Sequence, residues 1–298
     1  MEKEKILVFG AKGQLGCTLT KILKEKKCSL GNLPKFLEET EILGLSSKEL
    51  DITKMEDVLK LIQKEKPYAV VNCAAYTDVD GCEDNKEKAF LVNSLGPRNI
   101  AIACEKEKAK FFHISTDYVF DGEEKGFKIE FDSINPKSIY GKSKALGEQY
   151  AMNFCSRFFI LRTAWLYGEN GNNFVKTIVK LAKEKKEIYV VDDQIGTPTN
   201  VVDLSYAIAK LLDTKEYGIY HCTGKGECSW FEFANHIVRC FELEAKIKPC
   251  STEQFKRKAK RPKHSTLENF MLKQTVGDVF RDWKKALETF AEKFKNSF

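Results

Sequence analysis

Short apolar runs alternate with amphipathic stretches through the first half of the chain. The apolar runs are of strand length and are bounded by glycine or polar residues, so they predict buried strands. These strands are predicted at 6–9, 41–45, 68–75, 109–115 and 158–162. Apolar positions at helical spacing predict helices at 14–26, 53–65, 85–107 (broken at 96–97) and 138–154. This alternation predicts an α/β fold with a doubly wound parallel sheet covered by helices on both faces.

The second half continues the alternation less regularly. Helices are predicted at 174–185, 201–212, 230–241 and 282–293, and strands at 188–191 and 217–222, the latter rejoining the sheet. We therefore expect two units. A sheet domain comprises residues 1–167 plus 197–222, and a smaller mixed α/β C-terminal lobe comprises 168–196 plus 223–298. Residues 27–40 show no clear period and are predicted to be a surface insertion.

Composition and charge narrow the classes of function. The 298 residues are 43% hydrophobic and 31% charged, which excludes disorder. No apolar stretch approaches the ~20 residues of a membrane helix, and the first apolar segment is too short for a signal peptide, so we expect a cytoplasmic protein. The net charge of +6 and pI of 8.6 suit anionic small molecules but not nucleic acid. The ten cysteines contain no Cys-x-x-Cys pair, and no metal site is predicted.

Three glycines spaced by three residues follow the first predicted strand and open the first predicted helix. Gly10 permits a tight turn, Gly13 lets the backbone approach a diphosphate, and Gly16 allows close helix–strand packing. Gln14 and Leu15 lie in the first helical turn, where backbone amides attract an anion. A glycine-rich turn without a ligand is the plainer interpretation. The strand–turn–helix context favours a dinucleotide site.

The end of the second predicted strand bears on the form of the cofactor. No carboxylate stands there to bind a ribose hydroxyl, and Ser46, Ser47 and Lys48 are suited to a 2′-phosphate. Lys48 is equally an ordinary solvated lysine. NADPH is therefore slightly favoured over NADH, and both stay open. Asp51 and Ile52 follow near the expected adenine position, although Asp51 also suits the cap of the next helix.

A Tyr-x-x-x-Lys set opens the helix predicted at 138–154. Tyr140 and Lys144 are four residues apart and share a helix face. An ammonium nearby is expected to lower the phenol pKa from near 10, so that Tyr140 exchanges a proton with a ketone. Thr116 ends the fourth predicted strand, where ligands bind in open α/β sheets. Its alternative role is to cap its own turn.

Together these motifs resemble the dTDP-4-dehydrorhamnose reductase family, within the extended short-chain dehydrogenase/reductase superfamily with its Rossmann sheet. The resemblance spans essentially the whole chain. The matching strings lie at 9–16, 71–80, 115–122, 135–144, 161–168, 171–174, 193–199 and 261–267. The sequence departs from the family at the uncharged end of the second strand, at the insertion of residues 27–40, and at Lys263-His264.

The resemblance implies hydride transfer from NADPH or NADH to the 4-keto group of a dTDP-6-deoxyhexulose, a nucleotide-sugar substrate. It makes Thr116, Tyr140 and Lys144 the catalytic residues. Ala74, Ala75 and Thr77 match positions along the cofactor. The predicted substrate contacts are Thr116, Asp117, Val119, Trp165, Asn173 and Arg261. Arg261 suits bidentate binding of a phosphate, although it is also compatible with a solvated basic loop. Trp165 is also compatible with packing in the hydrophobic core.

Other functions remain open from the sequence. A related 4-keto-sugar reductase or an epimerase uses the same motifs, and a homologous branch serves as a regulatory subunit of methionine adenosyltransferase. The strings at 74–80 and 193–199 follow the reductase pattern and weigh against that subunit. A homodimer is expected from the family. Mg²⁺ is not supported, because the nearest candidate ligands are two glutamates predicted to be exposed, Glu184 and Glu187.

Overall fold

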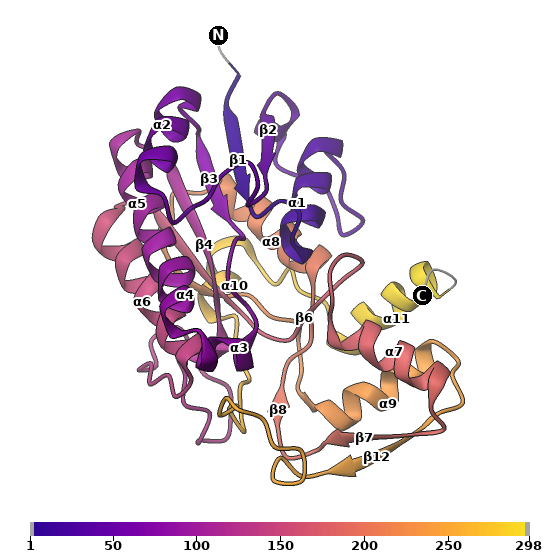
Figure 1. The fold of residues 1–298 in the computed structure, drawn as a ribbon. Coiled ribbons are helices and arrows are strands. Elements are labelled where there is room, and N and C mark those ends of the chain that lie inside the picture. The colour runs from indigo at the N-terminus through magenta and orange to yellow at the C-terminus, as the bar shows by residue number, and fades with distance from the viewer. Residues whose placement is uncertain (1–2, 296–298) are drawn as a thin grey trace.

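Six parallel strands form the central sheet in the order β10-β5-β4-β3-β1-β2 (Figure 1). The computed structural model describes residues 3–295. The strands are β1 (Lys5–Phe9), β2 (Glu41–Leu45), β3 (Ala69–Asn72), β4 (Lys110–Thr116), β5 (Phe158–Thr163) and β10 (Gly218–His221). The order reverses direction between β1 and β3, so the carboxyl ends of these strands border the crevice in which such sheets bind ligands.

Helices cover both faces of this sheet (Figure 1). Ile6 and Val8 of β1 pack with one face's helices, whereas Leu7 and Phe9 pack with the other's. Burial on both sides explains why the strands are continuous apolar runs. The first face carries α1 (Gln14–Glu25), α8 (Val201–Leu212) and α10 (Phe270–Val276). The second carries α2 (Met55–Glu65), α5 (Gly96–Lys106) and α6 (Ile139–Phe154).

The predicted interruption at 96–97 is confirmed, because α5 begins at Gly96 directly after a π-helical turn. After α3 (Val79–Asp84), the chain runs through α4 (Lys86–Phe90) into α5 by way of one π-helical turn, Leu91–Leu95. Proline is tolerated in the first turn of α5, because its missing N–H has no helical partner there. The π turn approaches α6 so closely that a Cβ on Gly147 would lie 2.2 Å from the Asn93 carbonyl oxygen.

The C-terminal lobe has its own hydrophobic cluster, centred on Phe233, Ile237 and Leu287. Its helices are α7 (Phe174–Glu184), α9 (Trp230–Cys240) and α11 (Trp283–Phe294). Its parallel strands are β7 (Glu187–Val191) and β12 (Lys246–Cys250). Two short ladders, β6 (Leu166–Tyr167) with β9 (Thr199–Asn200) and β8 (Ile195–Gly196) with β11 (Cys228–Ser229), complete the strands. The exact domain boundaries stay a prediction.

The helices and strands of the sheet agree closely with the sequence prediction, and β2 and α8 have the predicted bounds. Strand β12 and helix α10 were not predicted. The expected surface insertion contains a 3-10 helix, Lys35–Glu38, whose Leu37 is buried in the core beside α1 and α8. Within residues 3–295, no helix is long and apolar enough to cross a membrane.

Candidate active site

The turn after β1 has no space for side chains. Gly10 has a φ of +74°, and a Cβ there would lie 2.7 Å from the Ala74 nitrogen. A Cβ on Gly16 would lie 2.2 Å from the Gly10 oxygen, and Leu15 is buried below the turn. Gly13 is the N-cap of α1 and provides no side-chain cap, so the first helical amides stay available to an anion. These residues fit the diphosphate of a NAD(P) cofactor.

The end of β2 differs from the prediction, because a carboxylate does reach it. Glu49 accepts hydrogen bonds from the Ser46 nitrogen (2.8 Å) and the Ser46 hydroxyl (2.7 Å). Ser46 is therefore already partnered, while Ser47 and Lys48 are exposed. Glu49 lies only three residues from Ser46, a spacing typical of such local capping that sequence reasoning overlooked.

The other predicted cofactor residues surround the glycine turn. Ala74 lies against Gly10, Ala75 is half-buried, and Thr77 is exposed. Ile52 is buried under the chain that leads into α2. The Asp51 carboxylate accepts hydrogen bonds from the nitrogen (3.0 Å) and hydroxyl (2.7 Å) of Thr53. Asp51 therefore has the capping role that the sequence offered as the alternative to cofactor binding.

Thr116, Tyr140 and Lys144 meet where β4 ends beside the first two turns of α6. The Tyr140 phenol lies near the Thr116 hydroxyl, which favours the ionised form of the phenol and so acts to lower its pKa. Thr116 in turn donates to Asp117 Oδ1 at 2.8 Å. Lys144 is 2% exposed and its ammonium donates to the Ile114 carbonyl at 2.5 Å. The structure thus brings the three predicted catalytic residues together.

The expected lowering of the Tyr140 pKa by Lys144 is wrong for this structure. Burial raises the pKa of Tyr140 well above 10, and only the Thr116 hydroxyl opposes that rise. Burial also lowers the pKa of Lys144 to about 8, against the attraction of Glu148. Tyr140 is therefore protonated at neutral pH, which is the form that donates a proton to a carbonyl oxygen.

A buried ion pair between Glu148 and Arg162 lies next to these predicted catalytic residues. Glu148, one helical turn after Lys144, accepts from Arg162 Nη2 (2.8 Å) and Nε (3.0 Å). Ser115, the residue before Thr116, donates to the same carboxylate at 2.5 Å. The Glu148 and Arg162 side chains are 1% and 3% exposed. The pair fastens α6 to β4 and β5 next to the catalytic residues.

An apolar cavity of about 310 Å³ lies between the loop after β4 and the lobe. Tyr118 borders it, and the Tyr118 ring meets the Tyr140 ring edge-on at a centroid distance of 5.5 Å. Trp230 and Gln194 line it from the lobe. Sequence reasoning missed these three residues. A cavity of this volume beside Tyr140 has the size and lining of a small-molecule site.

Trp165 supports this cavity from behind. Its ring stacks on Trp230 with centroids 3.4 Å apart and planes 8° apart. Its φ of +45° is a strained value for a tryptophan, a type of strain that collects at functional sites. A Cβ on Gly196 would lie 2.4 Å from the Trp165 ring, so glycine is required beneath it.

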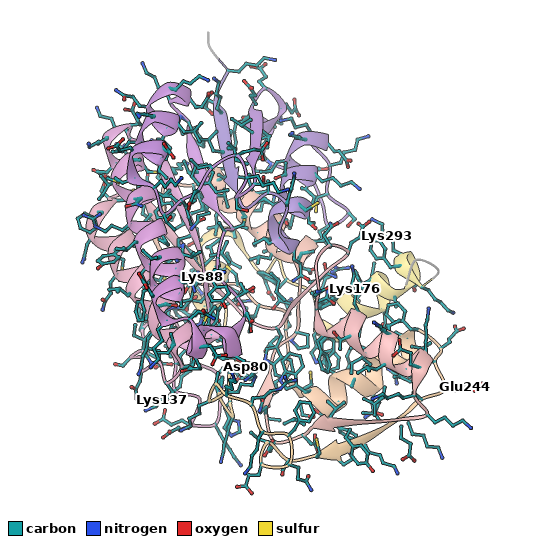
Figure 2. The ribbon with its side chains drawn as sticks, in the orientation of Figure 1. Asp80, Lys88, Lys137, Lys176, Glu244 and Lys293 are labelled. Carbon is teal, nitrogen blue, oxygen red and sulfur yellow. The ribbon has the colours of Figure 1, made fainter. Side chains whose placement is uncertain are left out.

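The other predicted substrate residues are already engaged. Arg261 lines the cavity and forms a two-pronged pair with Asp80 of α3, both contacts at 3.0 Å. Asp80 is labelled in Figure 2. Asn173 caps α7 and donates to Gln14 Oε1 at 2.9 Å. Val119, in the 3-10 helix Asp117–Val119, is fully buried.

Comparison with known proteins identifies the family. The family model described as "RmlD substrate binding domain" matches residues 4–296. The spore coat polysaccharide biosynthesis protein SpsK of Bacillus subtilis (strain 168) is 39% identical and covers 97% of each chain. A crystal structure of a dTDP-4-dehydrorhamnose reductase from Clostridium acetobutylicum has a TM-score of 0.92 and 46% identity, covering 98% of this chain and 99% of that one.

A second dTDP-4-dehydrorhamnose reductase structure, from Bacillus anthracis in complex with NADP, has a TM-score of 0.91 and 42% identity, covering 98% of this chain and 100% of the other. The chain belongs to the dTDP-4-dehydrorhamnose reductase family. Membership confirms the resemblance inferred from the motifs and the α/β fold. Within residues 3–295 no cluster of three or more His, Cys, Asp or Glu side chains is placed to hold a metal ion.

Removing one partner of the buried ion pair should be costly for this family member. Glu148→Gln leaves the Arg162 charge buried without a counter-charge, so we expect a loss of roughly 3 kcal/mol or more in the free energy of unfolding. Urea denaturation measures it. Glu56→Gln, which removes one partner of the exposed pair with Lys60, should change stability by less than about 1 kcal/mol. Equal effects of the two substitutions would contradict the role assigned to Glu148.

Asp117 makes stability depend on pH. Burial raises its pKa to about 6, against the hydrogen bond from Thr116, whereas an unfolded aspartate titrates near 3.9. Between these values the folded chain holds a proton that the unfolded chain has released, so stability falls as pH rises. Relative to Asp117→Asn, the wild type should lose about 3 kcal/mol between about pH 4 and pH 7, measured by urea denaturation.

Asp121, a few residues further on, provides the matched control. Hydrogen bonds, chiefly from the Glu123 backbone, lower its pKa. The folded chain therefore releases this proton first, and the wild type should gain stability relative to Asp121→Asn only as pH rises to about 4, with little further change between about pH 4 and pH 7. Equal slopes for both variants would show that Asp117 is not the buried titrating group.

Proposed function

We propose that the protein uses NAD(P)H to reduce the 4-keto group of dTDP-4-dehydro-6-deoxy-L-mannose, giving dTDP-L-rhamnose. The observation that carries this proposal is the half-buried Tyr140, whose ring meets Tyr118 at the border of the aromatic cavity and whose phenol stays protonated. The names of the Clostridium and Bacillus anthracis relatives support the substrate class.

The chain's own residues supply an acid and a dry site. When bound, the reduced cofactor supplies the hydride that adds to the carbonyl carbon. Tyr140 gives its phenolic proton to the carbonyl oxygen as negative charge develops there. Thr116 donates a hydrogen bond to the same oxygen, exchanging Asp117 for the substrate. Lys144, held by the Ile114 carbonyl, would bind the ribose of the nicotinamide half through its ammonium.

The diphosphate and base have candidate partners on the lobe. We assign the cavity bordered by Tyr118 and Trp230 to the nucleotide and Arg261 to its diphosphate, which replaces Asp80 on the guanidinium. NADPH is proposed as the preferred cofactor, because Ser47 and Lys48 are exposed at the end of β2. The homodimer and the cytoplasmic location stay predictions.

The acid is tested by Tyr140→Phe. Loss of the phenolic proton should lower kcat about 100-fold or more and leave the affinity for NADPH nearly unchanged. The measurement is NADPH oxidation with the 4-keto sugar nucleotide, with Tyr150→Phe on the same helix as control. Turnover unchanged in Tyr140→Phe would refute the assignment.

The same assay separates the alternative functions. Bound NAD that is retained without net consumption would indicate an epimerase. Failure to reduce any 4-keto sugar nucleotide, together with capture of a methionine adenosyltransferase, would indicate a regulatory subunit. Faster reduction of a different 4-keto sugar nucleotide would support the proposed reaction but identify a different substrate.

The Lys144 pKa should set the pH above which kcat/KM for NADPH declines. Because burial lowers it to about 8, the ammonium is lost above that pH, and kcat/KM for NADPH should fall as pH rises through about 8. An unburied lysine would keep its charge to about pH 10. Initial rates across this range give the profile, and Lys142→Ala on the exposed side of α6 should leave it unchanged. A flat profile to about pH 10 would show that the Lys144 charge is not required.

A further inference from the structure

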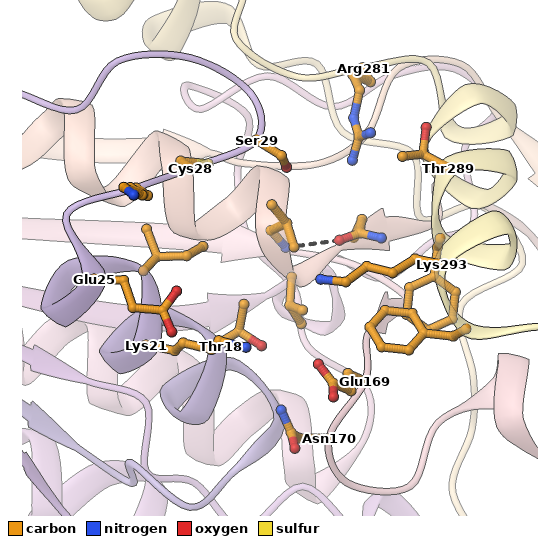
Figure 3. Close-up of a pocket in the computed structure, with 17 residues that line it drawn as sticks. Thr18, Lys21, Glu25, Cys28, Ser29, Glu169, Asn170, Arg281, Thr289 and Lys293 are labelled. Carbon is orange, nitrogen blue, oxygen red and sulfur yellow. Dashed lines mark hydrogen bonds between the residues drawn. The ribbon is translucent and has the colours of Figure 1, made fainter. Parts of the chain in front are cut away.

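A cavity of about 410 Å³ lies away from the residues assigned to cofactor and substrate (Figure 3). Helices α1 and α8 and the segment 27–29 form its wall on the sheet side. Residues 169–170 and α11 form its wall on the lobe side. The cavity therefore spans the junction between the sheet and the lobe, and its volume is in the range of small-molecule sites.

Basic side chains outnumber acidic ones in its lining. The basic residues are Lys21, Lys27, Arg281 and Lys293, and the acidic ones are Glu25 and Glu169. Within residues 3–295, Lys21, Lys27 and Lys293 form no ion pair. A surplus of unpaired positive charge in a cavity attracts an anion.

Two of these cations converge. Figure 3 shows the Arg281 guanidinium and the Lys293 ammonium both directed toward the middle of the cavity, with Glu25 on the opposite side. Arg281 is fixed in place because its Nε and Nη2 donate to Asp203 at 2.9 and 2.6 Å. The Lys293 ammonium lies 5.1 Å from the centroid of the Phe294 ring and has no carboxylate partner among residues 3–295. A held guanidinium beside such an ammonium suits the several oxygens of a phosphoryl group.

The remaining wall combines apolar side chains with the polar Thr18, Ser29, Asn170, Asn200 and Thr289. Phe290, Val201 and Ile22 line the cavity and are 5%, 1% and 8% exposed. These side chains offer contact area to an uncharged body and no hydrogen bonds. A ligand that matches both parts of the lining carries an anionic group at one end and an apolar or ring-shaped portion at the other.

We propose that this cavity binds a small organic phosphate, with its phosphoryl group between Arg281 and Lys293 and its apolar portion against Phe290. The occupant touches both the sheet side and the lobe side. The lobe-side loop also reaches the cofactor turn, because Asn173 bonds Gln14 and a Cβ on Gly171 would lie 3.4 Å from the Gln14 Cβ. Binding therefore favours one placement of the lobe relative to the sheet.

The experiment uses phenyl phosphate as the probe, titrated calorimetrically into the full chain saturated with NADP⁺, which fills the cofactor diphosphate site. We expect one binding event per chain. Inorganic phosphate and phenol, each carrying half of the recognised chemistry, should bind more weakly. No binding of phenyl phosphate at millimolar concentration overturns the proposal.

Charge reversal locates the site. Lys293→Glu should weaken binding of phenyl phosphate about tenfold or more, and Lys21→Glu, on the opposite wall, should weaken it in the same direction. Lys285→Glu makes the same charge change on an exposed position of α11 outside the cavity and should alter the affinity less than about twofold. Equal affinities for the wild type and Lys293→Glu overturn the proposal.

A further variant distinguishes this cavity from the proposed substrate cavity. Arg257 lines the latter, so Arg257→Glu should leave phenyl phosphate binding unchanged. Weakening by Arg257→Glu with no effect of Lys293→Glu places the probe in the substrate cavity and overturns the inference. Because binding is measured directly, its outcome is independent of whether the chain reduces the proposed sugar nucleotide.

Discussion

The catalytic geometry depends on one buried ion pair, that of Glu148 with Arg162. Removing both charges from water is costly, and the cost is offset only because Arg162 grips the carboxylate through two nitrogens and Ser115 satisfies one of its oxygens. These bonds join a helix and two strands at the level of the active site. Thr116 follows Ser115 directly, and Lys144 precedes Glu148 by one helical turn, so the pair fixes the spacing of the residues proposed to be catalytic.

Burial also determines the proton states at this site. The same exclusion of water that raises the pKa of Tyr140 lowers that of Lys144, because in each case the neutral form is favoured. The phenol is thereby kept as an acid, and the ammonium is charged only up to about pH 8. Glu148 opposes the loss of the lysine charge, while Arg162 limits how strongly it does so. A reductase needs this combination, since the proton must be present on the phenol before the hydride arrives.

The features that sequence predicted are those set by local spacing. The glycine turn, the Tyr140–Lys144 face and the alternation of strands and helices each depend on residues close in the chain, and the structure has all three. The contacts that were missed join distant segments. Arg261 pairs with Asp80, and Trp165 stacks on Trp230, at separations that no periodicity encodes. The hydrogen bond from Ser46 to Glu49 is local and was nevertheless overlooked. The pattern of apolar residues in a strand does not indicate that a side chain folds back onto a residue three positions earlier.

The pairing of Arg261 with Asp80 changes how its role must be understood. An arginine in a basic loop looks free in the sequence, yet here the guanidinium already has a carboxylate partner, with side chains 21% and 24% exposed. A partly solvated pair of this kind is worth little, so exchanging the carboxylate for a diphosphate costs little and gains a second negative charge. Lys258 and Lys260 hold the same loop to Asp84 and Glu123 through exposed pairs. The loop is therefore held at the edge of the aromatic cavity, where an anionic ligand would have to displace Asp80 to bind Arg261.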